Sequence, residues 1–202
     1  MTTETTPVND LVERVAAVLR SHNIEAIVVD TADRARETVL GIVSEGAEVH
    51  SGKSRTLEEV GLYRELMESG RYEAIRPKVF SMDRATQGRE IRKLSAAPDI
   101  MLGSVAAVTE DGALVAASAT GSQLGAYASG AGRLILVVGS QKIVPDLDAA
   151  LRRVREVVFP WENEQVQARM GVDTILEKVL IIYGEWTAGR TTVVLVREPD
   201  GI

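Results

Sequence analysis

Residues 133–139 read RLILVVG, and this short run decides the fold class. Five consecutive side chains are apolar, and three of them are β-branched, which favours a strand buried on both faces. Residues 25–30, EAIVVD, have the same character. Strands without a polar face are typical of a parallel sheet that has helices on both sides.

Helical segments separate these apolar runs. Asn9 or Asp10 precedes a first helix, Thr31 begins a second that ends near Gly46, and Thr56 with Glu59 predicts a capping box. Further helices are predicted at 56–69, at 83–97 and after Asp146, and further strands at 47–51, 100–102 and 113–117. Strands that alternate with helices predict one α/β domain over residues 1–202, with a mainly parallel central sheet.

The last forty residues have a different pattern. Residues 162–180 are predicted to be helical, and 179–186 and 191–198 to be two strands around a turn at 187–189. We expect these strands to form an antiparallel hairpin, which either completes the main sheet or makes a homodimer contact.

Composition excludes several classes of function. Absence of cysteine among the 202 residues excludes disulfides, thiolate catalysis and iron–sulfur ligation, and two histidines make a metal site unexpected. A net charge of −6 argues against a nucleic-acid partner. No apolar run reaches the roughly 20 residues of a membrane span, and the start MTTETTPVND lacks signal-peptide features, so we expect a cytoplasmic protein.

The first candidate site is the loop after the strand at 47–51, where residues 50–62 read HSGKSRTLEEVGL. A nucleotide-binding P-loop is rejected, because its first glycine position holds Ala47. The loop still predicts a phosphate or carboxylate site at a helix start, formed by Ser51, Gly52, Lys53, Ser54, Arg55 and Thr56. The alternative is a plain helix cap with Lys53 and Arg55 in water.

The second candidate is Thr109-Glu110-Asp111-Gly112. A functional interpretation makes Glu110 a nucleophile or general base at a strand end, with Gly112 in the ligand site. The alternative is a hairpin turn with exposed carboxylates, because Asp-Gly between apolar runs is a strong turn signal.

Two further strand ends carry small or charged residues. Gly121, Ser122 and Gln123 follow one strand and either bind an anion or begin a helix with close packing. Lys142 follows the strand at 133–139 and either points into the same crevice or is solvated. In an open α/β sheet, ligands bind beyond the carboxyl ends of the strands, so these loops are expected to meet.

The blocks SGKSRTLEEVGL, APDIMLGSVAAVTEDGALV, GSQKIVPDLDAALRRVRE and TTVVLVREPDG strongly resemble the LUD-domain family of LutC/YkgG-type lactate-utilisation proteins. The resemblance covers almost the whole chain. It implies a three-layer α/β/α sandwich of the NagB/RpiA/CoA-transferase-like group. CoA-transferases of that group use a glutamate before x-Gly as nucleophile, which maps onto Glu110. Relatives often carry Gly-Asn-Arg where this chain has Gly121-Ser122-Gln123.

The resemblance also implies a role in oxidation of L-lactate to pyruvate, beside iron–sulfur or flavin oxidase subunits. This chain lacks cluster ligands and a Gly-x-Gly-x-x-Gly motif, so no cofactor is expected and the role would be accessory. A self-sufficient transferase or sugar-phosphate isomerase that uses Glu110 is the alternative. A non-catalytic ligand sensor or scaffold is a third hypothesis.

Overall fold

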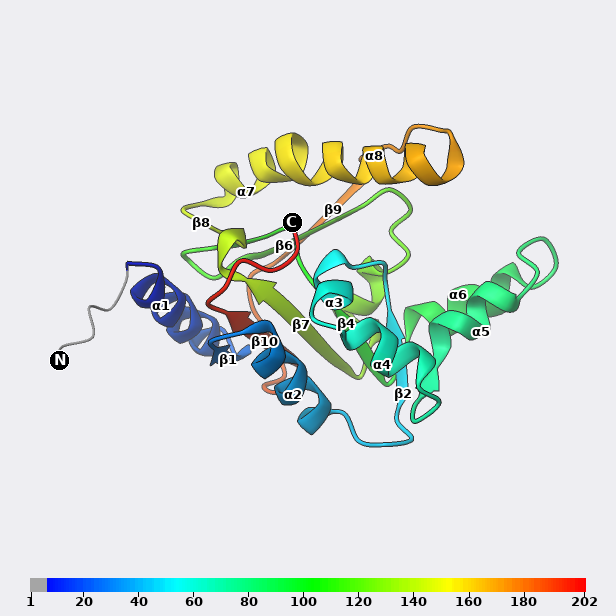
Figure 1. Cartoon of the computed structure of the whole chain (residues 1–202), viewed down its shortest axis with the longest axis horizontal. Coiled ribbons are helices and arrows are strands. Elements are labelled where there is room, and N and C mark those ends of the chain that lie inside the picture. The colour runs from blue at the N-terminus through cyan, green and yellow to red at the C-terminus, as the bar shows by residue number, and fades with distance from the viewer. Residues whose placement is uncertain (1–6) are drawn as a thin grey trace.

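The computed structural model describes residues 7–202 and contains two sheets (Figure 1). The larger one is entirely parallel, in the order β1-β10-β7-β4-β2-β3. Its strands are β1 (Glu25–Val29), β2 (Glu48–Ser51), β3 (Glu73–Ala74), β4 (Ile100–Gly103), β7 (Arg133–Gly139) and β10 (Thr191–Val196). The predicted parallel sheet of an α/β/α fold is therefore confirmed.

Strand β7, the RLILVVG run, lies inside this sheet and is buried on both faces. Leu134, Leu136 and Val138 pack into a core that includes α1 (Pro7–Ser21). Ile135 and Val137 point into a second core on the opposite face. The helices of that second face are α2 (Ala32–Ile42), α3 (Arg55–Glu59) and α4 (Leu62–Glu68). An apolar strand is required here because successive side chains alternate between the two cores, so neither face of the strand is exposed to solvent.

The smaller sheet has the order β8-β5-β6-β9 and shares the core that contains α1. Its strands are β5 (Ala107–Thr109), β6 (Leu114–Ser118), β8 (Ile143–Val144) and β9 (Lys178–Ile182). Its other side packs against α7 (Leu147–Arg153) and η3 (Val154–Val158), which continue into α8 (Phe159–Met170). Figure 1 shows this long helical segment above the small sheet.

The predicted C-terminal hairpin is wrong. β9 pairs antiparallel with β6 in the small sheet, whereas β10 lies between β1 and β7 in the large one. The two strands are adjacent in the chain, but their side chains are suited to different cores: β10 is buried throughout, and β9 is partly exposed. Local sequence shows two strands and a turn, and it does not show which partners each strand has.

Several helix boundaries differ from the prediction. The helix predicted at 56–69 is divided by Gly61, whose φ of 77° is left-handed, into α3 and α4. The helix predicted at 162–180 ends at Met170, because Gly171 adopts a left-handed φ of 70°. Both glycines adopt a conformation that side chains with a Cβ rarely accept.

An extra helix precedes the one predicted at 83–97. Helix α5 (Ile75–Ser81) contains Pro77 in its first turn, where a missing N–H costs little. Helix α6 (Gly88–Ala96) begins five residues later than predicted, because the Asp83 side chain holds residues 83–87 in a turn. Together α5 and α6 form an arm that projects from the body below α8 (Figure 1).

Candidate functional site

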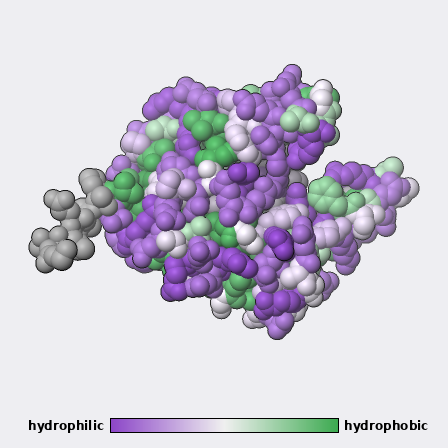
Figure 2. Space-filling view, in the orientation of Figure 1, coloured by the Kyte–Doolittle hydropathy of each residue, from purple (hydrophilic) through white to green (hydrophobic). Residues whose placement is uncertain are grey.

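A cleft of about 1260 Å³ opens at the carboxyl ends of β2, β4 and β7. One wall is the α5–α6 arm, and another is α8 with the segment after it. The space-filling view shows the surface notched between these two parts (Figure 2). This is the edge of a parallel sheet at which ligands commonly bind.

Lys142 forms part of the cleft floor. It lies in η2 (Ser140–Lys142), directly after β7, and only 4% of its surface is exposed. Its Nζ donates hydrogen bonds to Thr56 Oγ1 at 2.7 Å and to Ser104 Oγ at 2.9 Å. Ser104 Oγ in turn donates to the carbonyl oxygen of Val137 at 2.6 Å. The amine is therefore held between the hydroxyl of Ser104, directly after β4, and the hydroxyl of Thr56 in the first turn of α3.

The surroundings of Lys142 destabilise its protonated form. Burial, followed by the nearby positive charge of Arg153, lowers the pKa of Lys142 to about 7. Glu59 and Asp200 oppose this change, but among residues 7–202 no carboxylate forms an ion pair with Lys142. A buried ammonium without a paired anion either loses its proton or binds an anion from outside.

The loop Ser51–Thr56 reaches the cleft with four of its six residues, Lys53, Ser54, Arg55 and Thr56. Ser54, not Thr56, caps α3 by accepting from the backbone N–H of Leu57 at 3.3 Å. The predicted Thr56–Glu59 capping box is thus wrong, and the hydroxyl of Thr56 accepts from Lys142 instead. Because α3 has only five residues, side-chain cations rather than a long helix dipole provide the positive charge.

The two cations of this loop have protein partners. Arg55 donates to Glu59 at 2.6 Å on the same helix. Lys53 pairs with Glu162 of α8 at 3.3 Å and lies 5.4 Å from the centre of the Trp161 ring. The Lys53–Glu162 pair therefore connects two walls of the cleft. The alternative hypothesis placed Lys53 and Arg55 in water. In the structure each of them pairs with a carboxylate instead.

Ser51 and Gly52 lie behind the cleft surface. Ser51 is 1% exposed, and its Oγ has no hydrogen-bond partner among the residues that the structure describes. Its carbonyl oxygen accepts from Arg76 at 3.1 Å. Gly52 packs beside Gln123, whose Cβ is 3.5 Å from the position that a Cβ on Gly52 would take. The loops at 51–56 and 121–123 are therefore neighbours, as predicted for strand ends at one edge.

Gly121, Ser122 and Gln123 line the cleft before η1 (Ala126–Gly130). Gln123 Oε1 accepts from Ser118 and Ser122 at 3.1 and 3.2 Å. Gly121 has a φ of 80°, and its N–H donates to Ser118 Oγ at 2.9 Å. The backbone N–H of Gly121 is thus used within the turn, and Gln123 is engaged by its neighbours.

The rim carries more positive charge than the overall composition indicates. Arg76, Arg84 and Arg92 line the cleft from the arm, and Arg169 lines it from α8. Glu162 is the one acidic residue among the described residues that line it. In a chain with a net charge of −6, this distribution makes the cleft a positive region on an acidic protein.

Glu110 and Gly112 lie outside the cleft lining. The segment is the β5–β6 turn that the alternative interpretation predicted, with a Gly112 φ of 87°. Glu110 is exposed and lies 3.9 Å from Arg14 of α1. Gly112 packs against α1, where a Cβ would come within 2.8 Å of Val18. The structure therefore does not bring Glu110 and Lys142 together in one crevice, although the sequence-based hypothesis placed both there.

Sequence reasoning missed Ser104 and Arg76. Ser104 follows β4 directly, so the rule that strand ends supply site residues would have found it. Arg76 gave no such signal, because α5 itself was not predicted. Arg76 also contributes, after burial, to lowering the pKa of His50 to about 4, so this buried histidine beside the site is neutral.

Within residues 7–202, no helix is both long and apolar enough to cross a bilayer. No group of three or more histidine, aspartate or glutamate side chains in the same part of the chain could hold a metal ion.

Comparison with known proteins now identifies the family. The LUD domain profile matches residues 12–196, which is nearly the whole chain. The chain belongs to the LUD-domain family. This family is linked to lactate utilisation, and the sequence resemblance is confirmed at that level.

Among solved structures, the LUD domain resembles a crystal structure described as a DUF162 family protein from Deinococcus radiodurans. The TM-score is 0.51 at 12% identity, and the match covers 94% of this chain and 97% of that one. At this identity the likeness supports the fold alone. The search of curated proteins found no match.

Proposed function

We propose that this LUD domain is a non-redox component of a lactate-utilisation system that binds a small anionic ligand in the cleft. The ligand would carry a carboxylate or a phosphate. The observation that carries the proposal is the buried Lys142 amine on the cleft floor, which has hydroxyl partners but no carboxylate partner within residues 7–202.

Counting donors supports this proposal. A lysine ammonium has three N–H groups, and Thr56 and Ser104 accept two of them. The third is available to a ligand oxygen. The arginines of the rim add a field that attracts anions and disfavours cations.

The chemistry also couples binding to proton uptake. Because burial lowers the pKa of Lys142 to about 7, a large share of the free protein carries a neutral amine above that pH. An anion favours the ammonium, so binding above about pH 7 takes up a proton, and the affinity falls as the pH rises further.

The lactate part of the proposal has a different basis. Family membership indicates the pathway, and the sequence lacks cysteine ligands for a cluster and a dinucleotide-binding motif. Electrons from lactate would then pass through partner subunits of the iron–sulfur or flavin type. The anion in the cleft would be the substrate, the product or a regulatory ligand of that system.

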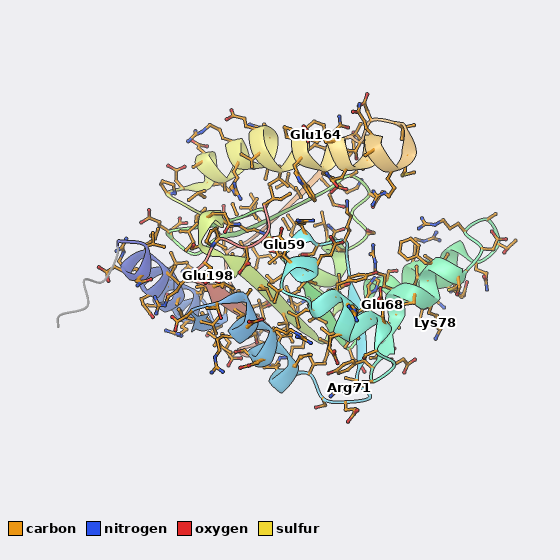
Figure 3. The ribbon with its side chains drawn as sticks, in the orientation of Figure 1. Glu59, Glu68, Arg71, Lys78, Glu164 and Glu198 are labelled. Atoms are coloured by element: carbon orange, nitrogen blue, oxygen red, sulfur yellow. The ribbon has the colours of Figure 1, made fainter. Side chains whose placement is uncertain are left out.

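Thermal unfolding with a panel of anions tests the binding proposal. The panel contains L-lactate, pyruvate, phosphosugars and coenzyme A esters. A ligand at about 100 times its dissociation constant adds roughly 2.7 kcal/mol of stability. We expect a shift of the melting temperature that is lost in Lys142→Met and kept in Lys78→Met. Lys78 is the matched control, because it projects from the side of α5 turned away from α8 (Figure 3).

Calorimetry in buffers of different ionisation enthalpy measures the proton uptake directly at about pH 8. A ligand that binds equally well to the wild type and to Lys142→Met would contradict the assignment of Lys142 as the residue that binds the anion. A cleft that binds none of these anions would overturn the binding proposal.

The pathway proposal has its own test. The tagged chain is purified from its host after growth on lactate, and the co-purifying proteins are identified. We expect oxidase subunits with iron–sulfur or flavin groups. Absence of such partners, together with unchanged growth on lactate after deletion, would contradict the assigned role.

A further inference from the structure

The amine of Lys142 is placed to act as a nucleophile when neutral, as well as to bind an anion when protonated. In its neutral form it has two N–H groups and one lone pair. Thr56 and Ser104 accept both N–H groups, and Ser104 is itself fixed by its bond to Val137. The lone pair is then the one hydrogen-bonding feature of the amine that remains unused.

The direction in which the amine can react is limited by its neighbours. The backbone of Gly201 lies against it, since a Cβ on Gly201 would be 3.2 Å from Nζ and 2.1 Å from Thr56 Oγ1. Gly201 is held there by its N–H, which donates to Glu59 at 2.6 Å. Lys142, Thr56 and Ser104 all line the cleft, so the approach that remains open is from the cleft side.

We propose that Lys142 Nζ forms an imine with the carbonyl carbon of a small 2-oxo acid bound in this cleft. The inference rests on the proposed anion binding: the arginines that line the cleft hold the carboxylate, while Lys142, in its neutral form, faces the ketone. Pyruvate is the simplest acid of this class, and it is the product of lactate oxidation.

The step balances without a further reactant. The Nζ lone pair forms a bond to the carbonyl carbon, and a proton passes from nitrogen to the former carbonyl oxygen, which gives a carbinolamine. The hydroxyl then leaves with the second N–H proton as water, and a C=N bond remains. Burial, by lowering the pKa of Lys142, keeps the neutral amine available near pH 7.

The hydroxyl neighbours suit this step. Thr56 Oγ1 and Ser104 Oγ lie within hydrogen-bond distance of Nζ and 3.4 Å from each other. Thr56 Oγ1 is able to accept a proton from nitrogen and to donate one to oxygen, because a hydroxyl is both donor and acceptor. Ser104 Oγ donates its own proton to the carbonyl oxygen of Val137 and so serves to hold the amine in place. No such pair surrounds an ordinary surface lysine, such as Lys78.

The test uses pyruvate and sodium borohydride with the full chain. Borohydride delivers hydride to the imine carbon and converts the adduct into a stable secondary amine. Intact-mass spectrometry counts the adducts, and peptide mapping locates them. We expect one reduced adduct on Lys142 in the wild type and in Lys78→Met, and none at that position in Lys142→Met. L-Lactate, which has no carbonyl carbon to attack, should give no adduct.

Peptide mapping of the wild type does not depend on whether Lys142→Met folds, so the proposal remains testable if that variant is unstable. Adducts that are scattered over surface lysines, or absent from Lys142, would overturn the imine. Calorimetry without borohydride separates the two proposals. Pyruvate that binds without an adduct contradicts the imine alone, whereas a cleft that binds no anion contradicts both.

Discussion

Glu110 and Lys142 are both charged residues at strand ends, but the structure gives them opposite surroundings. Glu110 is exposed on the β5–β6 turn, and its carboxylate lies 3.9 Å from the guanidinium of Arg14. Lys142 is 4% exposed and fixed by two hydroxyls. Charge at the end of a strand is therefore insufficient to identify a site residue.

The register of the small sheet explains the difference. β5 and β8 are parallel, with Val108 opposite Ile143 and Thr109 opposite Val144. Lys142 precedes β8, whereas Glu110 follows β5 and donates its N–H to Val144. The two residues thus lie at opposite ends of one strand pair, and only the Lys142 end opens into the cleft.

The strongest test of this contrast is the loss of affinity in Lys142→Met. The variant keeps the volume and removes the charge. A hydrogen bond to a charged group contributes about 1.5–3 kcal/mol, so we expect an affinity for the cleft anion that is roughly 10 to 100 times lower. Titration calorimetry of both proteins measures it. An equal affinity would show that the buried amine has no part in binding.

The pH dependence of stability sharpens the comparison. Lys142 has a folded-state pKa of about 7, against 10.5 as its ordinary value. Between these values the unfolded chain holds up to one more proton, so the free energy of unfolding rises with pH, by up to about 1.4 kcal/mol per pH unit. We expect this rise in urea titrations of the wild type and its loss in Lys142→Met. If the free energy of unfolding changes with pH in the same way in both proteins, the lowered pKa of Lys142 is contradicted.

Two hydroxyls of one loop provide a smaller test. Ser54→Ala removes a helix cap and should lower the free energy of unfolding by about 1 kcal/mol. Thr56→Val removes an acceptor from Lys142 and should lower it by about 1–2 kcal/mol. Only Thr56→Val is expected to change the pH dependence described above. Urea titrations over a range of pH distinguish them, and an equal pH response in both variants would refute the separate roles.

The smallest effect is expected for Glu110→Gln. An exposed ion pair at this distance contributes little, so the free energy of unfolding should change by no more than about 0.5 kcal/mol. The ligand-induced shift of the melting temperature should equal that of the wild type. Loss of that shift would return Glu110 to the site, against its position in the structure.

The fold could be predicted largely because its strands are unusual. Runs such as 133–139 have no polar face, and this property alone indicates a sheet covered on both sides. The partners of β9 and β10 could not be predicted, because a turn between two strands is compatible with one sheet or two. The pattern does not predict helix α5, because Pro77 is a helix breaker everywhere except in a first turn, which is where α5 places it.

The site could be predicted in part. Lys53, Ser54, Arg55, Thr56 and the loop at 121–123 do meet at one cleft, as the strand-end rule requires. The arm with Arg76, Arg84 and Arg92 could not be predicted, because its position depends on packing between distant segments. The burial of Lys142 could not be predicted either, because Gly201 and Ser104, which cover it, come from remote parts of the chain.

The central position of β10 has a consequence for synthesis on the ribosome. β1 emerges early, but its sheet neighbour is β10, and Glu25 reaches Thr192 across 167 positions of sequence. Until residues 191–196 leave the exit tunnel, β1 and β7 each have an unpaired edge. The nascent chain must therefore remain soluble until β10 has emerged, with an apolar groove between β1 and β7 where that strand will insert.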